Sequence, residues 1–259
     1  MDLGLEGRTA VVTGASRGIG LAITRGLAAH GALVVAGARR SSAELEELAE
    51  KGQVQVLEVD LADPGGPGRL MALAQNGPDI LVNNVGGAPA RTGGFLSITD
   101  EDWQASLTIN LMAAVRTTRS ALPAMLAAGT GSIVTICSVN ASLPDPAVLD
   151  YSAAKAALAA FCKALSKEVG PRGVRVNTVS PGPVATDLWL GDHGVAQTVG
   201  RATGAKPEDV ANQAAHDSVT GRFSRPEEVA DLVLLLASDR TANVTGADFR
   251  IDGGLIPTW

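Results

Sequence analysis

A glycine-rich segment near the start of the chain constrains the fold more than any other feature. Residues 9–13 form a short β-branched run without polar alternation, which is typical of a strand buried on both faces of a parallel sheet. Gly14, Gly18 and Gly20 follow, and an amphipathic helical pattern then continues to Gly31. Such a turn binds anions, because glycines admit a close backbone approach and the helix end offers free N–H groups. The segment therefore predicts a dinucleotide-binding α/β sheet.

The rest of the chain alternates buried strands with helical patterns, so we expect a Rossmann-type, doubly wound parallel sheet of about seven strands with helices on both faces. Further strands are predicted at residues 33–37, 54–59, 80–82, 132–137, 174–179 and 248–251, and helices at 42–51, 69–74, 99–128 and from Tyr151 to about Gly170. A kink is expected at Pro123. The 259 residues suit one domain, 1–259, because α/β domains of this length bury a large core without splitting.

One long segment, at about 188–223, lacks a regular pattern apart from a short helix after Pro207. Loops of this length inside compact domains are usually functional, so we expect a substrate-binding lid here.

Composition excludes several classes of protein. The net charge of −6 with dispersed Lys and Arg argues against a nucleic-acid surface. No apolar run reaches the ~18 residues that span a bilayer and no leader opens the chain, so we expect no membrane association and a cytoplasmic location. Cys137 and Cys162 lie in apolar runs without metal-binding spacing, which favours reduced, buried thiols and no metal site.

The residues after the second predicted strand indicate the choice of cofactor. A carboxylate in this region suits the ribose 2′-hydroxyl of NAD, whereas an arginine suits the 2′-phosphate of NADP. The chain has Ala38, Arg39 and Arg40 here, and Arg17 stands in the glycine turn. Each arginine alone could be an ordinary solvated charge, but two converging on one site favour NADPH.

Polar residues also follow the third and fourth strands. Asp60 could hydrogen-bond the adenine amino group or cap the next turn. Asn83, Asn84 and Gly86 stand where ligands bind in open α/β sheets, although asparagines there can also satisfy turn backbone. Asn110 interrupts a predicted helix, where asparagine is a mediocre helix former.

The only tyrosine of the chain, Tyr151, is followed four residues later by Lys155. On a helix these side chains share one face, and an ammonium group stabilises a neighbouring phenolate, so the pair is a candidate proton-transfer device. A packing tyrosine beside a solvated lysine is the alternative for an isolated pair. Ser138, at the end of the fifth strand, comes thirteen residues before the tyrosine.

Over nearly its whole length the chain resembles the short-chain dehydrogenase/reductase family. The matching residues are Thr13 to Gly20, Asp60, Asn83, Asn84, Gly86, Asn110, Ser138, Tyr151, Lys155, Asn177, Pro181, Gly182, Val184 and Thr186. Val85 replaces the usual alanine and adds bulk behind the cofactor, which we expect the site to tolerate.

The resemblance implies roles for individual residues. Tyr151 would be the general acid, Lys155 would support it and bind the nicotinamide ribose, Ser138 would hydrogen-bond the substrate oxygen, and Asn110 would hold a water linking Lys155 to solvent. The implied cofactor-binding residues are Gly14, Ser16, Arg17, Gly18, Ile19, Gly20, Arg39, Asp60, Leu61, Asn84, Gly86, Tyr151, Lys155, Pro181, Gly182, Val184 and Thr186, the last two gripping the carboxamide. The implied substrate contacts are Asn140, Leu143, Asp145, Trp189 and His193.

Three functions fit these residues. The first is an NADPH-dependent carbonyl reductase, which transfers a hydride between nicotinamide and a small-molecule ketone or secondary alcohol. The second is a β-ketoacyl carrier-protein reductase. Such an enzyme needs a basic patch beside the pocket to receive an acidic carrier protein, and Arg172 with Arg175 is too small a cluster to decide whether this chain has one. The third is a catalytically idle dinucleotide sensor. The resemblance also implies a homotetramer, with Trp259 a candidate anchor on its own or a neighbouring subunit.

Overall fold

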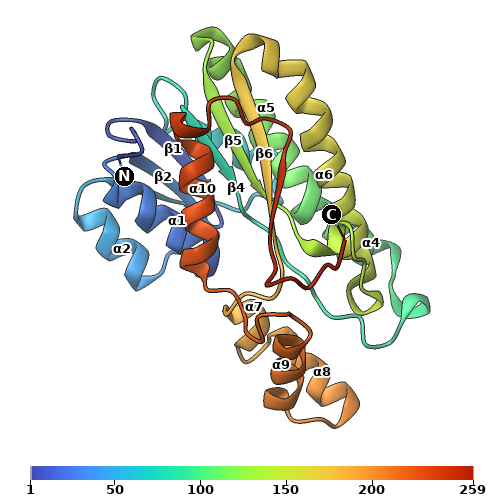
Figure 1. Ribbon diagram of the computed structural model, residues 1–259. Helices are drawn as coiled ribbons and strands as arrows, with labels where there is room; N and C mark the ends of the chain where they lie inside the picture. The colour runs from blue at the N-terminus through green and yellow to red at the C-terminus, as the bar shows by residue number, and fades with distance from the viewer. Residues whose placement is uncertain (1, 259) are drawn as a thin grey trace.

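Seven strands form one parallel sheet in the order β3-β2-β1-β4-β5-β6-β7 in the computed structural model, which describes residues 2–258 (Figure 1). Every strand pairing is parallel. The strands are β1 Thr9–Thr13, β2 Leu33–Ala38, β3 Val54–Glu58, β4 Ile80–Asn83, β5 Gly131–Ile136, β6 Val174–Pro181 and β7 Asp248–Ile251. The expected doubly wound sheet is confirmed, and its strand order reverses between β1 and β4, where ligands bind in such sheets.

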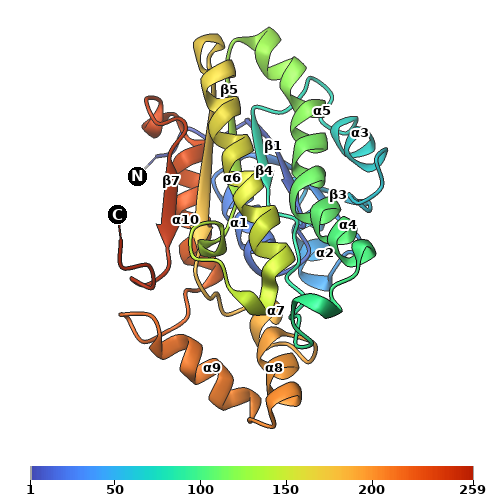
Figure 2. The same ribbon diagram turned by 90° about the vertical axis from the view of Figure 1, so that its right-hand side faces the viewer.

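Helices cover both faces of the sheet, as the two perpendicular views show (Figures 1 and 2). One face packs against α1 (Gly18–Ala29), α2 (Ala43–Glu50) and α10 (Pro226–Ala237). The other face packs against α3 (Gly66–Met71), α5 (Ala113–Ala128) and α6 (Leu149–Val169). Successive residues of a strand point to opposite faces of the sheet. Val12 therefore packs in the core beneath α1, α2 and α10, and Val11 in the core beneath α3, α5 and α6. Burial on both faces explains why the strands lack polar alternation.

The predicted helix over 99–128 is divided in the structure. Thr99 caps α4 (Asp100–Leu107) as expected, and its hydroxyl accepts the amide of Asp102. A π-helical segment, Thr108–Met112, then separates α4 from α5. Pro123 lies inside α5 (Ala113–Ala128), and the helix continues past it. The helical geometry over 99–128 changes instead at the π-helical segment that contains Asn110.

The segment predicted as an irregular lid is mostly helical, which corrects that expectation. It contains α7 (Asp187–Leu190), α8 (Val195–Thr203) and α9 (Pro207–His216), which extend beyond the body of the molecule (Figure 1). Only the helix after Pro207 was expected. Glycines around α7 and α8 had hidden the helical pattern of these two segments. Gly204, for example, ends α8 in the left-handed conformation at φ +78°. Trp189 packs edge-to-face on Phe223, with ring centroids 5.3 Å apart, and so joins the two ends of the segment.

Several boundaries differ by a few residues from the predicted ones. α3 begins at Gly66 because Pro67 suits a first helical turn, and α6 begins at Leu149, two residues before Tyr151. Cys137 and Cys162 are buried free thiols, as predicted. In the described part of the chain, no helix combines the length and apolarity needed to cross a membrane. Trp259 lies outside the described residues.

Candidate active site

A cavity of about 1550 Å³ runs along the carboxyl ends of β1 to β6. Its volume exceeds the ~300–1,000 Å³ of a pocket for one drug-sized ligand, so it has room for a dinucleotide and a second molecule. All of the predicted cofactor residues line it, as do Ser138, Asn140, Leu143, Asp145 and Trp189. Asn110 and His193 do not line it.

The glycine turn after β1 is packed too closely for side chains. Gly14 has φ +67°, a conformation that favours glycine, and a Cβ on Gly20 would clash with the Gly14 carbonyl. Asn84 braces the turn, since its Nδ2 donates to the carbonyl oxygens of Thr13 (2.9 Å) and Gly14 (3.1 Å). The asparagine therefore satisfies turn backbone while lining the cavity. α1 begins at Gly18 without a side-chain cap, so its first N–H groups face the site uncapped.

Two arginines line the part of the cavity after β2, where the sequence predicts that the adenosine ribose binds. Arg39 and Arg40 follow β2, are exposed and line the cavity together with Ser41. The Ser41 hydroxyl is buried without a hydrogen-bond partner, whereas its amide donates to the Glu58 carboxylate at 2.8 Å. Two guanidinium groups and an unpaired hydroxyl fit a 2′-phosphate. Arg17 stands farther along the cavity, 3.7 Å from the Asp187 carboxylate.

Two polar residues after β3 and β4 have structural partners. Asp60 accepts the amide of Ala62 at 2.9 Å, so it caps its own turn while lining the cavity. Asn83 is buried and its Nδ2 donates to the hydroxyls of Thr118 (3.0 Å) and Thr135 (3.5 Å). Asn83 thus ties β4 to the helix layer, and Asn84 is the one of the pair that faces the ligand space.

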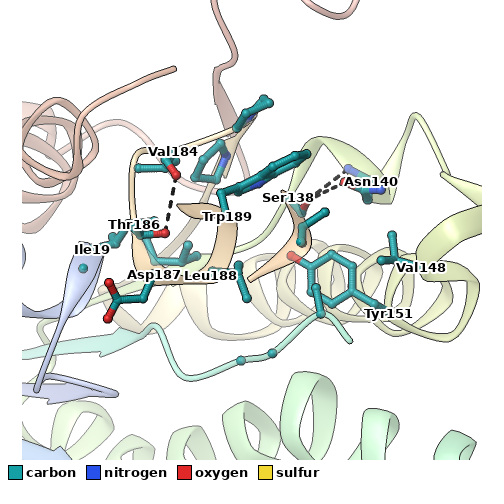
Figure 3. A pocket seen from close by; sticks show the side chains of 18 of the residues that line it. Ile19, Ser138, Asn140, Val148, Tyr151, Val184, Thr186, Asp187, Leu188 and Trp189 are labelled. Carbon is teal, nitrogen blue, oxygen red and sulfur yellow. Dashed lines mark hydrogen bonds between the residues drawn. The ribbon is translucent and has the colours of Figure 1, made fainter. Parts of the chain in front are cut away.

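Tyr151 and Lys155 share one face of α6, as their spacing predicted. The Lys155 Nζ lies 5.7 Å from the centre of the Tyr151 ring and donates to the Ile136 carbonyl at 2.8 Å. Lys155 is only 3% exposed, so its ammonium is fixed at the end of β5. The Tyr151 side chain points into the cavity opposite Trp189 (Figure 3). The alternative of a solvated lysine beside a packing tyrosine is wrong.

Ser138 is oriented by Asn140 (Figure 3). The serine hydroxyl donates to the Asn140 Oδ1 at 3.2 Å and accepts the Asn140 amide at 3.1 Å. Asn140 Nδ2 in turn donates to the Ser152 hydroxyl on α6 at 3.4 Å. This chain of contacts sets the serine relative to the helix that carries Tyr151.

Asn110 supports the site from behind rather than lining the cavity. Its Oδ1 accepts the Gly87 amide and its Nδ2 donates to the Gly87 carbonyl, both at 2.9 Å. A Cβ on Gly86 would lie 2.9 Å from this Oδ1 and 3.6 Å from the Lys155 Nζ. The side chain therefore holds the turn after β4 against Lys155, a contact that the resemblance did not imply. Its part in a water relay stays a prediction.

The turn after β6 forms the part of the cavity where the resemblance predicts that the nicotinamide binds. Pro181, Gly182, Val184 and Thr186 line it, and the Thr186 hydroxyl donates to the Val184 carbonyl at 3.4 Å (Figure 3). Opposite them, a Cβ added to Gly18 would lie 3.1 Å from the Thr186 methyl. The glycine turn and this segment thus approach each other across the cavity. Asn177, at the middle of β6, is buried and braces the crossing to β7 through the Val244 carbonyl.

The cavity lining also includes groups that the sequence did not single out. Asp209, Gln213 and Asp217 line the cavity from one face of α9, and Val210 and Ala214 stand between them. Asp209, Gln213 and Asp217 are spaced four residues apart, as residues on one face of a helix are. The apolar pattern of α9 was too short, however, to predict which face of the helix points into the cavity. His193 is exposed and does not line the cavity, and its contact with a substrate stays a prediction.

The two cysteines contribute no reactive group. Burial raises the pKa of the Cys137 thiol, and burial raises the pKa of Cys162 to about 12. Both stay protonated near neutral pH and are poor nucleophiles. Among the residues described, no cluster of His, Cys, Asp and Glu could hold a metal ion.

Similar proteins share this architecture over their full lengths. A family model described as enoyl-(acyl carrier protein) reductase matches residues 14–256. A 3-oxoacyl-[acyl-carrier-protein] reductase of Aquifex aeolicus is 34% identical, over 98% of this chain and 100% of that protein. The crystal structure of L-sorbose reductase from Gluconobacter frateurii, complexed with NADPH and L-sorbose, is 36% identical with a TM-score of 0.89 over 100% of both chains.

A further solved structure is a putative NAD(P)-dependent gluconate 5-dehydrogenase from Beutenbergia cavernae with bound NADP. It is 35% identical, with a TM-score of 0.87 over 100% of both chains. The motifs, the strand order and these matches agree, and the chain belongs to the short-chain dehydrogenase/reductase family of oxidoreductases.

Proposed function

We propose that the protein is an NADPH-dependent reductase of an uncharged small-molecule ketone, with Tyr151 as the acid that protonates the carbonyl oxygen. One observation carries the proposal: Tyr151, Lys155 and Ser138 line the same cavity as the glycine turn and the two arginines after β2. NADPH supplies the hydride in such a reaction. A catalytically idle sensor would not need this arrangement.

The protein groups act on the charge that develops at the substrate oxygen. Tyr151 and Ser138 both line the cavity, and the Ser138 hydroxyl would turn its proton from the Asn140 Oδ1 to a substrate oxygen. Donors aimed at a developing oxyanion lower the barrier most in the transition state. Lys155 donates to the Ile136 carbonyl, and this contact holds its ammonium 5.7 Å from the centre of the Tyr151 ring. It stabilises the phenolate left after proton transfer and binds the nicotinamide ribose.

The adenosine end favours NADPH over NADH. Arg39, Arg40 and the unpaired hydroxyl of Ser41 offer donors to a 2′-phosphate. The nearest carboxylate of this group, Glu58, is already held by the Ser41 amide. The NADPH and NADP in the two similar crystal structures support the same preference.

A carrier-bound ketoacyl substrate is the second candidate, because similar proteins include 3-oxoacyl-[acyl-carrier-protein] reductases. The charges at the cavity favour a free substrate. The described lining residues between 187 and 217 include Asp187, Asp209 and Asp217 but no Lys, Arg or His. Arg17 lies 3.7 Å from Asp187 and offsets its charge, but an acidic carrier and its phosphate-bearing arm would still meet repulsion from Asp209 and Asp217. A sugar-like or other neutral ketone meets no such penalty.

The arginines that might have formed a carrier-docking patch lie elsewhere. Arg175 stands at the start of β6, whereas the cavity lies at the carboxyl ends of the strands. Its guanidinium donates to the carbonyl oxygens of Leu236 (2.8 Å) and Ser238 (3.1 Å) and so braces the end of α10. Arg172 lies in the turn just before it, at the same end of the sheet.

The proposal is tested by initial rates of NADPH and NADH oxidation with a panel of neutral ketoses, simple ketones, keto acids and an acetoacetyl carrier-protein thioester. We expect turnover of a neutral ketone, at least about tenfold faster with NADPH, and weak turnover of the anions. Efficient reduction of the carrier thioester would instead favour the second candidate. Replacing Asp209 and Asp217 together by Asn should improve the anionic substrates selectively.

We further propose that the enzyme works as a homotetramer in the cytoplasm. Family members are usually tetramers, and Phe95 and Leu96 expose 61% and 95% of their surface on the loop before α4, as an intersubunit contact would require. Reduced, buried thiols and NADPH-dependent chemistry are consistent with a reducing compartment.

A further inference from the structure

The proposed acid stands in the first turn of α6, directly after a 3-10 turn, Pro146–Val148, that the Asp145 side chain caps. α6 begins at Leu149, so Tyr151 is its third residue. The residue at the cap position, Val148, offers no side-chain hydrogen bond to the helix. First turns without a cap fray, because their N–H groups lack partners. Something else must hold this turn if Tyr151 is to meet a carbonyl oxygen in a fixed position.

A buried ion pair lies at this turn. Asp150 is 0% exposed, and the Arg91 guanidinium reaches both of its carboxylate oxygens, with the Nη2 at 2.6 Å and the Nε at 3.2 and 3.3 Å. The Arg91 side chain is itself 15% exposed. Hydrogen bonding to Asp150 raises the pKa of Arg91, so its guanidinium stays charged. Asp150 also places a negative charge in the first helical turn, where the helix dipole favours it.

Arg91 joins three elements that meet at the cavity. It belongs to the segment after β4, whose Gly86, Ala88 and Ala90 line the cavity. Its amide donates to the Ala147 carbonyl at 2.6 Å, just before α6. Its Nη1 donates at 2.8 Å to Asp102, the residue that completes the capping box of α4. The cavity wall, α4 and the first turn of α6 are therefore connected through one side chain.

We propose that Arg91 and Asp150 are positioning residues that fix the first turn of α6, and with it the hydroxyl of Tyr151, against the cavity wall formed after β4. Neither residue lines the cavity. They act by fixing the orientation of Tyr151. The proposal rests on the proposed function, in which Tyr151 is the acid. Loss of Arg91 alone leaves Asp150 as a buried, uncompensated anion that must move towards water, which pulls the turn with it.

The decisive variants are Arg91→Met, Arg91→Lys and the double variant Arg91→Met with Asp150→Leu. We expect Arg91→Met to lower kcat by about a hundredfold, as misplacement of a catalytic group by ~1 Å does, with the Kd for NADPH within about threefold of the wild type. Arg91→Lys should recover part of kcat through its charge. The double variant should be less impaired than Arg91→Met, because no unpaired charge remains.

A second readout does not depend on turnover. Hydrogen exchange of the amides at 152–155, the first in α6 that have a carbonyl acceptor four residues earlier in the helix, should accelerate in Arg91→Met and not in the matched control Arg8→Met. Arg8 likewise bridges two carboxylates, of Asp239 at 2.6 Å and Asp79 at 3.7 Å, but at the opposite end of the strands. Exchange therefore tests the positioning claim even if no ketone is reduced, in which case only the proposed function fails.

Either of two results would overturn the inference. One is wild-type kcat or unchanged exchange at 152–155 in Arg91→Met. The other is an equal loss of kcat in Arg8→Met at a similar thermal midpoint, which would assign the effect to general stability.

Discussion

At the scale of single residues, adding one methyl group to the glycine turn tests whether the cofactor binds there. Gly20→Ala would drive a Cβ into the Gly14 carbonyl and the Asn84 amide, so the turn must open where the pyrophosphate binds. We expect the Kd for NADPH to rise at least about tenfold, measured by fluorescence titration. Gly68→Ala is the control, because a Cβ there meets nothing within 4 Å. Equal affinities in the two variants would contradict the assignment.

Residues with a chemical signature could be predicted from the sequence, whereas their supporting partners could not. The glycine turn, Ser138, Tyr151 and Lys155 stand at diagnostic spacings. Arg91 is 59 residues from Asp150, and only the folded chain brings them together. The resemblance implied that Asn110 holds a water, whereas nothing in the sequence indicates the contact of its side chain with Gly87.

At the scale of elements, Glu228 anchors the start of α10. It accepts two guanidinium hydrogen bonds from Arg222 and the Arg225 amide, and these contacts lower the pKa of Glu228 to about 2. Its stabilising effect is complete above pH ~4.5 and is lost as the pH falls through about 2, because the unfolded carboxyl binds its proton first.

The corresponding variant is Glu228→Gln. We expect its thermal midpoint to lie a few degrees below that of the wild type at pH 7, with the difference shrinking as the pH falls from 4.5 towards 2. The neighbouring Glu227, 3.9 Å from Arg25, provides the control Glu227→Gln. A difference that stays constant with pH would rule out the ion pair as the cause.

The sequence predicted the elements best where periodicity was strong. Strands buried on both faces were located within one or two residues. The π-helical segment was missed because its sequence, Thr108–Met112, continues the helical pattern on both sides. The lid helices α7 and α8 were missed because they are short and separated by glycines.

At the scale of the whole molecule, the doubly wound parallel sheet could be predicted from the sequence, but assembly does not follow from one chain. For a 26.3 kDa chain we expect a solution mass four times as large, measured by light scattering. Replacing the exposed Leu96 by Asp should reduce it, since burying a carboxylate in an apolar contact is unfavourable. A monomeric wild-type protein would refute the homotetramer.

The most direct test compares Tyr151→Phe with the wild type in single-turnover oxidation of NADPH by the best neutral ketone. The variant loses only the hydroxyl that faces the cavity, so NADPH should bind within about threefold of the wild-type affinity. Its rate should fall by at least about a thousandfold, because the developing oxyanion then lacks its proton donor. A Tyr151→Phe rate close to that of the wild type would contradict the proposed mechanism.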